Sequence, residues 1–140
     1  MKAIKLACVG ALAAITFANP AAANINEFIG EWKNVDSNAR GVIRLTISYN
    51  GPNIDAHVWG SCKPTPCDWG TVQAIPYGGS VRSPLPAQAE VLRAEYDHGF
   101  ARQQVIIRKA PNKELRVEVL THFTDSSGRS NYFSADLFSR

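Results

Sequence analysis

The sequence lacks the motifs from which common catalytic and phosphate-binding sites are recognised. It contains no nucleophile elbow, no His-Glu-x-x-His motif, no phosphate loop and no paired-carboxylate pattern. Two of its histidines, His98 and His122, fall in or beside expected turns and are interpreted as surface residues. We therefore predict a protein that is not an enzyme and that uses no cofactor and no metal ion.

A hydrophobic run long enough to span a membrane is also missing. The almost unbroken apolar stretch Leu6–Ala18 has 13 residues, whereas a spanning helix needs about 20. It follows a positive start with Lys2 and Lys5, and the small residues Ala21–Ala23 come after it. These are the three parts of a secretory signal peptide. The sequence thus predicts a signal peptide over residues 1–23 and a periplasmic or secreted bacterial protein without a membrane span.

Charge of one sign is not in excess. The chain has 15 basic and 12 acidic residues, and removal of Lys2 and Lys5 with the signal peptide leaves 13 basic residues and a net charge of +1. The arginines are scattered along the chain rather than clustered. Because nucleic-acid binding requires a basic patch or stripe, we do not expect nucleic acid as a partner.

Cysteine is scarce, which makes its use easier to assign. Removal of residues 1–23 leaves Cys62 and Cys67, separated by Lys63-Pro64-Thr65-Pro66. An even count in an exported protein predicts a disulfide. A redox pair usually shows the Cys-x-x-Cys spacing, and a zinc site needs two further ligands nearby. We therefore predict a Cys62–Cys67 disulfide that fixes the shape of a proline-stiffened loop.

Helical periodicity is nearly absent, and apolar residues alternate with polar ones over most of the chain. In the clearest case, Ile43, Leu45 and Ile47 point to one face of a strand. Turn signals such as Asn50-Gly51-Pro52-Asn53 separate the alternating segments. The pattern predicts strands over residues 31–35, 41–50, 54–59, 68–75, 89–97, 101–109, 114–123 and 131–138.

Strands joined by short turns predict an all-β fold in a single domain, residues 24–140. Because such a meander must hide its edges, we expect closure into an eight-stranded antiparallel up-and-down β-barrel. The alternative is a two-sheet sandwich, which needs longer crossing connections. A barrel of this size either fills with side chains or holds one small ligand. The sequence leaves open which applies, and we expect a monomer.

The segment Asn26–Trp32 resembles the opening of a calycin, the superfamily of lipocalins, fatty-acid-binding proteins and avidins. In that superfamily a short helical turn leads into Gly-x-Trp on the first strand. An arginine near the end of the last strand packs over the tryptophan. The resemblance implies structural roles for Gly30, Trp32 and Arg140, with Trp32 at the closed end of the barrel.

A second resemblance lies in the segment Trp59–Gly70, which reads Trp-Gly-x-Cys-x4-Cys-Asp-Trp-Gly. Together with Trp32-Lys33-Asn34 and Arg40-Gly41-x-x-Arg44, it is similar to the signature of a group of uncharacterised bacterial secreted calycin-like barrels. The likeness implies membership of that group, and it implies no activity.

The strands beside the cystine loop carry the candidate ligand or partner surface, which we assign to Asp55, His57, Trp59, Asp68 and Trp69. Asp55, His57 and Trp59 alternate along one strand and so share one face. A carboxylate beside an imidazole can orient a base or contribute to a metal site. The alternative, which we favour, is a solvated face opposite buried residues.

The register of this hairpin decides where its two tryptophans point. If Cys62 and Cys67 lie opposite each other, Trp59 pairs with Gly70, and Trp69 faces Gly60. The two indoles then lie on opposite faces, one entering the barrel and one facing outward. A bulge in either strand would change this assignment.

The function we expect is non-catalytic binding of a small apolar or aromatic ligand that enters the barrel mouth. Two alternatives stay open. In one, a secreted or periplasmic protease inhibitor presents residues 24–28 to an active site. In the other, the chain is an envelope-associated module that binds another protein. The sequence does not identify the ligand or the partner.

Overall fold

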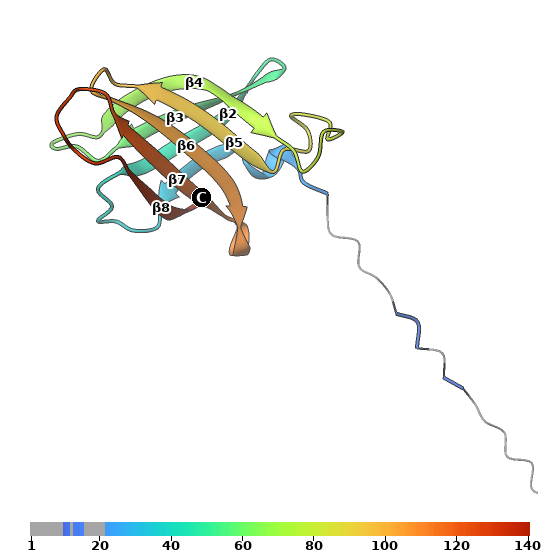
Figure 1. Ribbon diagram of the computed structural model, residues 1–140. Helices are drawn as coiled ribbons and strands as arrows, with labels where there is room; N and C mark the ends of the chain where they lie inside the picture. The colour runs from blue at the N-terminus through green and yellow to red at the C-terminus, as the bar shows by residue number, and fades with distance from the viewer. Residues whose placement is uncertain (1–9, 12, 16–21) are drawn as a thin grey trace, which may run out of the picture.

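The computed structural model describes residues 10–11, 13–15 and 22–140 (Figure 1). The predicted signal peptide lies mostly outside these residues. No helix in the described part of the chain is long and apolar enough to cross a membrane. Its helical segments are two short 3-10 turns, η1 (Ile25–Glu27) and η2 (Pro111–Lys113).

The rest of the fold is a single antiparallel sheet that closes on itself. Each strand pairs with the next one along the chain, and the last strand returns to pair with the first (Figure 1). The predicted eight-stranded up-and-down barrel is therefore confirmed. Its strands are β1 (Gly30–Asn34), β2 (Val42–Asn50), β3 (Asn53–Gly60), β4 (Cys67–Tyr77), β5 (Val91–Asp97), β6 (Ala101–Ala110), β7 (Glu114–Phe123) and β8 (Tyr132–Ser139).

The largest differences between predicted and observed strand ends, two residues each, lie on either side of the connection between β4 and β5. The sequence predicts that the fourth strand stops at Ile75, but β4 continues through Pro76 to Tyr77 because these residues pair with β5. It also predicts that the fifth strand starts at Ala89. That residue donates its N–H to a carbonyl within the preceding loop, and β5 starts at Val91. The prediction ended β4 too early because it took Pro76 as a strand breaker. It started β5 too early because Ala89 forms a turn hydrogen bond that the sequence pattern does not reveal.

The interior of the barrel is filled by side chains. On β3, Ile54, Ala56 and Val58 are buried while the residues between them are partly exposed, as the alternation predicts. Eight strands leave room for side chains or for one small ligand, and here side chains lie along the axis. Among those exposed by 2 % or less are Leu45, Ile47, Leu92, Val105, Ile107, Leu115, Val117 and Phe138.

One end of the barrel is closed by the turn that precedes β1. The indole N–H of Trp32 donates to the carbonyl of Phe28 at 2.8 Å, and both side chains are buried. The guanidinium carbon of Arg140 lies 4.6 Å from the centre of the Trp32 ring. Arg140 also donates to the carbonyls of Glu27 and Ile29, at 3.3 and 2.9 Å. Arg140 therefore holds in place the turn that precedes β1.

Gly30 provides the backbone conformation at the start of β1. Its φ of 134° is a conformation that residues with a side chain rarely adopt. A Cβ atom at this position would lie 3.7 Å from the guanidinium carbon of Arg140. Gly30, Trp32 and Arg140 thus make the contacts that the resemblance to calycins implies, and membership of that superfamily stays a prediction.

Candidate functional site

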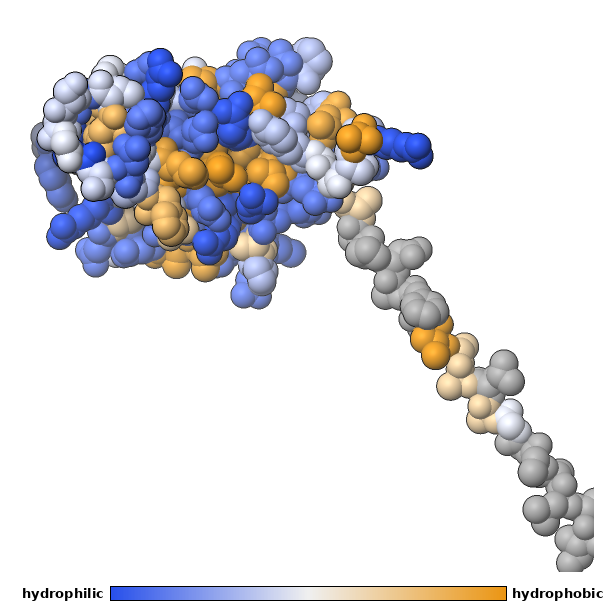
Figure 2. All heavy atoms as spheres, viewed as in Figure 1, coloured by the Kyte–Doolittle hydropathy of each residue, from blue (hydrophilic) through white to orange (hydrophobic). Residues whose placement is uncertain are grey.

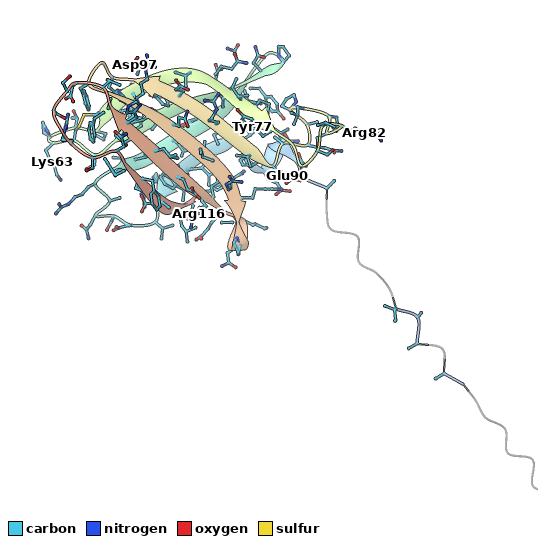
Figure 3. All side chains as sticks on the ribbon, in the orientation of Figure 1. Lys63, Tyr77, Arg82, Glu90, Asp97 and Arg116 are labelled. Carbon is cyan, nitrogen blue, oxygen red and sulfur yellow. A yellow bond between two sulfur atoms is a disulfide. The ribbon has the colours of Figure 1, made fainter. Side chains whose placement is uncertain are left out.

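The cystine hairpin joins β3 to β4 at the barrel end remote from the N-terminal turn (Figure 3). The sulfur atoms of Cys62 and Cys67 lie within bonding distance, and their Cα atoms are 5.3 Å apart. The predicted disulfide pairing therefore agrees with the structure. Because Pro64 and Pro66 restrict the backbone between the two cysteines, the tip of the hairpin has little conformational freedom.

The sequence left the register of this hairpin open, and the structure shows that it is not strict. Trp59 pairs with Asp68 rather than with Gly70, and Gly70 pairs with Val58, so Trp69 is an extra residue on β4. This is a β-bulge, and Gly70 accommodates it with a φ of 84°, in the left-handed region. The two tryptophans still point to different sides, with Trp59 on the outer face and Trp69 packed against the core.

Trp69 packs at the mouth of the barrel. Its ring makes edge-on contacts with Tyr96, at 5.5 Å between ring centroids, and with His98, at 4.8 Å. A Cβ atom at Gly60 would lie 2.7 Å from the Trp69 indole nitrogen, so this position requires glycine. Burial raises the pKa of the Tyr96 hydroxyl, and that hydroxyl donates to the carbonyl of Ala56 at 2.8 Å. Trp69 therefore anchors the hairpin to the core and to β5.

Trp59 lies on the outer face in a stack with His57. The two rings are 3.9 Å apart and nearly parallel, and the guanidinium carbon of Arg44 lies 4.1 Å from the Trp59 ring. The imidazole is held on both sides. Its Nε2 lies 2.5 Å from a carboxylate oxygen of Asp68, and its Nδ1 lies 3.0 Å from the hydroxyl of Thr71. Hydrogen bonds from Gly70 N–H and His57 hold the pKa of the Asp68 carboxyl below its ordinary value.

Asp55 and His57 share one face, as expected, but they do not act together. The Asp55 carboxylate accepts a hydrogen bond from the side-chain amide of Asn50 at 2.9 Å. The carboxylate partner of the His57 imidazole is Asp68. Thr71, His57 and Asp68 follow the order of a nucleophile, a base and an acid. They lie on the outer face of the barrel, where the His57 and Asp68 side chains are 29 and 58 % exposed. No group of three or more metal-ligating side chains occurs within the described residues.

A series of aromatic rings continues from the cystine hairpin across the rim of the barrel. His98 stacks on Phe100, with 5.9 Å between ring centroids, and Phe123 stacks on Tyr132 at 6.1 Å. Between the two pairs lies the guanidinium of Arg129, at 5.7 Å from the Phe100 ring and 4.1 Å from the Phe123 ring. We call the residues Trp69, His98, Phe100, Phe123 and Tyr132 the aromatic strip.

The aromatic strip ends at a hollow on the outside of β5 to β8, which we call the outer groove. Its volume is about 550 Å³. Leu120 and Phe133 are cross-strand neighbours in it, and Tyr132 lies beside them. These side chains expose 41, 70 and 55 % of their surface. Figure 2 shows hydrophobic side chains gathered on this face, over β6 and β7. Among its polar lining residues are Gln104, His122 and Asn131.

No protein-family model matches this chain, and neither a curated protein nor a solved structure matches it. Its function is therefore inferred from the geometry described above.

The sequence interpretation missed the outer groove, although one signal for it was present. In residues 114–123, Leu115, Val117 and Val119 take the inward positions, yet Leu120 places an apolar side chain at an outward position. Phe133 does the same on β8 and is 70 % exposed. Apolar residues at outward positions on neighbouring strands indicate a contact surface. His122, interpreted as an ordinary surface residue, lines the groove.

Proposed function

We propose that this protein binds a small apolar or aromatic ligand without catalysing a reaction, and that the ligand lies in the outer groove. The observation that carries the proposal is the concave cluster of Leu120, Tyr132 and Phe133, each exposed by 41 % or more. Covering such side chains removes apolar surface from water, which provides binding free energy. The groove volume of about 550 Å³ suits a small molecule.

Polar side chains at the border of the groove would orient this ligand. Gln104 supplies an amide, and His122 supplies an imidazole. The side-chain oxygen of Asn131 accepts the N–H of Phe123 at 3.0 Å, which fixes that side of the groove. An apolar floor with a few polar groups around it is typical of small-molecule sites. We therefore expect a mainly apolar ligand with one or two polar atoms.

The ligand is placed outside the barrel for a physical reason. The sequence led us to expect entry through the mouth, but Leu45, Ile107 and Val117 occupy the interior and are exposed by 2 % or less. A ligand there would have to displace close-packed side chains, which costs free energy. Residues at the mouth still take part in the proposed site, because the aromatic strip runs from the cystine hairpin to Tyr132, which lines the outer groove.

We also propose that the domain acts in the periplasm or outside the cell after removal of residues 1–23. The Cys62–Cys67 pair supports this, because disulfides persist in oxidising compartments. Edman sequencing of exported protein should begin at Asn24. A sequence that begins at Met1 would contradict this part of the proposal.

Protease inhibition by residues 24–28 receives less support. Ile25 and Phe28 are exposed by only 4 and 0 %, and the Ile25 N–H donates to the carbonyl of Ala87 at 2.9 Å. Insertion of this segment into an active site would remove both side chains from the core of the barrel. Binding of another protein remains the stronger alternative, and a surface for it lies elsewhere on the barrel.

Two measurements test the ligand proposal. Native mass spectrometry of protein purified from the periplasm should show a retained small molecule. Anilinonaphthalene sulfonate, a dye that fluoresces in apolar sites, provides a probe for the groove. Phe133→Ser should weaken dye binding by about threefold or more. Val81→Ser is the control, since Val81 is fully exposed in the connection between β4 and β5. Equal dye binding by wild type and Phe133→Ser would show that the groove is not the site.

A further inference from the structure

Two positively charged side chains lie side by side at the cystine end of the barrel. Lys33 on β1 and Arg44 on β2 are direct cross-strand partners. Both point outward, since their neighbours Trp32 and Leu45 are buried and side chains alternate along a strand. Like charges that face each other across a strand pair destabilise a sheet. The register therefore places two like charges at neighbouring positions on the outer face of β1 and β2.

Within the described residues, neither Lys33 nor Arg44 forms an ion pair with a carboxylate. The Arg44 guanidinium lies over the Trp59 ring, and its charge helps to lower the pKa of the Asp68 carboxyl. Arg108 and Arg116 offer a comparison, since they are also cross-strand partners. There, Arg116 donates to Glu118 at 2.9 Å, which compensates the repulsion. Lys33 and Arg44 have no such ion pair, which distinguishes them from Arg108 and Arg116.

A third cation shares a groove with this pair. The groove has a volume of about 460 Å³, and Lys33, Arg44 and Lys63 all line it. Lys63 extends from the cystine loop at the end of the barrel (Figure 3). Asp36 is the acidic residue in the lining, and its carboxylate already accepts the N–H of Asn38 at 2.9 Å. The groove, which we call the basic groove, therefore carries an excess of positive charge.

The wall of the basic groove is preorganised. Pro64 and Pro66 form part of it, and the Cys62–Cys67 bond closes the loop that carries them. A wall that is already fixed loses little conformational entropy on binding. Its cations are spread over two strands and a loop and do not converge on one buried point. This spacing suits several carboxylates along an extended chain better than a single small anion.

We propose that the basic groove docks an acidic peptide segment of a partner protein, whose carboxylates neutralise Lys33, Arg44 and Lys63. The prolines of the loop provide apolar contact between the charges. No residue that lines the basic groove also lines the outer groove, so this inference does not rest on the proposed small ligand.

Isothermal titration calorimetry of the full chain with a hexaglutamate peptide at low salt tests the proposal. We expect binding that weakens as salt is raised, since exposed charges are screened. The double variant Lys33→Gln, Lys63→Gln should bind roughly tenfold more weakly. The control Arg82→Gln, Lys113→Gln makes the same change in net charge at the opposite end of the barrel, where Arg82 lies (Figure 3). It should bind like wild type.

Lys33→Glu separates the binding role from any effect on folding. It replaces the repulsion by an attraction to Arg44, so the melting temperature should rise. Binding of hexaglutamate should fall at the same time, because one cation has become an anion. A variant that is more stable and binds less well cannot owe its loss to unfolding.

Three results would overturn the proposal. The first is no hexaglutamate binding by wild type at low salt. The second is equal weakening by the two double variants, which would indicate general charge attraction. In the third, inorganic phosphate or phosphatidylglycerol vesicles bind in a way that depends on Lys33 and Lys63, whereas hexaglutamate does not. That result would replace the acidic peptide by another occupant.

Discussion

The guanidinium carbon of Arg140 lies 4.6 Å from the centre of the Trp32 indole ring. Trp32 is 1 % exposed and bonded through its indole N–H to the carbonyl of Phe28. Trp32→Ala should therefore lower the free energy of unfolding by about 3–5 kcal/mol, because it leaves a cavity and breaks a buried hydrogen bond. Urea denaturation followed by circular dichroism measures this. A loss under about 1 kcal/mol would argue that the ring does not support the closed end.

Arg140→Gln should have a smaller effect. The substitution removes the cation over the Trp32 ring and two hydrogen bonds to backbone carbonyls. Because Arg140 is exposed, we expect a loss of about 1–2 kcal/mol in the free energy of unfolding. Arg140→Lys keeps the charge but not the planar donor group, so it should restore only part of this loss. Full restoration by lysine would show that charge alone matters.

The disulfide makes a separate prediction about covalent state and stability. Thiol titration of the unreduced exported protein should find no free thiol, because Cys8 falls within the predicted signal peptide and should be absent. The double variant Cys62→Ser, Cys67→Ser should be less stable by roughly 2 kcal/mol, because the closed loop is short. Titration of two thiols in unreduced protein would refute the pairing.

The barrel could be predicted because each strand follows a simple local rule. Ile54, Ala56 and Val58 alternate with polar residues, and short turns leave few ways to connect the strands. The tryptophan and arginine of the closed end were available from a resemblance, although they lie at opposite ends of the sequence. Both kinds of signal depend on residue type and order, which the sequence contains.

The candidate sites could be predicted less well, because they depend on register. The bulge at Trp69 shifts the pairing of the hairpin, and glycine at position 70 allows such a bulge without requiring it. Asp68 is therefore the carboxylate partner of His57. The spacing of Asp55 and His57 on one strand could not predict this partner, because it depends on how β4 pairs with β3. Likewise, Leu120 and Phe133 meet only because β7 pairs with β8 in one register. Each of these contacts depends on an alignment that no single segment specifies.

The two tryptophans of the cystine hairpin should differ in their effect on stability. Trp69 packs against the core and against the Tyr96 and His98 rings, whereas Trp59 stacks on His57 at the outer face. Trp69→Ala should cost about 2–4 kcal/mol of unfolding free energy, and Trp59→Ala about 1 kcal/mol. Urea denaturation of both variants measures the difference. Equal losses would contradict the placement of Trp69 at the core.

The hydrogen bonds of Asp68 make stability depend on pH. Gly70 N–H and His57 lower the pKa of this carboxyl from its ordinary value of 3.8 in the folded protein. A lowered pKa contributes stability above the unfolded value, and this contribution is lost as the pH falls through the folded value. The stability difference between wild type and Asp68→Asn should therefore be largest above about pH 5 and shrink toward about pH 2.

Urea denaturation of both proteins across that range measures the difference directly. The pKa values of Asp97 and Asp125 are also lowered, by hydrogen bonds from Gly99 N–H and from the Ser127 side chain respectively. Both carboxyls are present in wild type and in Asp68→Asn, so their contribution cancels when the two proteins are compared. The Asp68 side chain is 58 % exposed, so solvent screens its interactions, and the difference should shrink further at high salt. A difference that stays constant from neutral to acid pH would show that the Asp68 carboxylate does not hold the His57 imidazole.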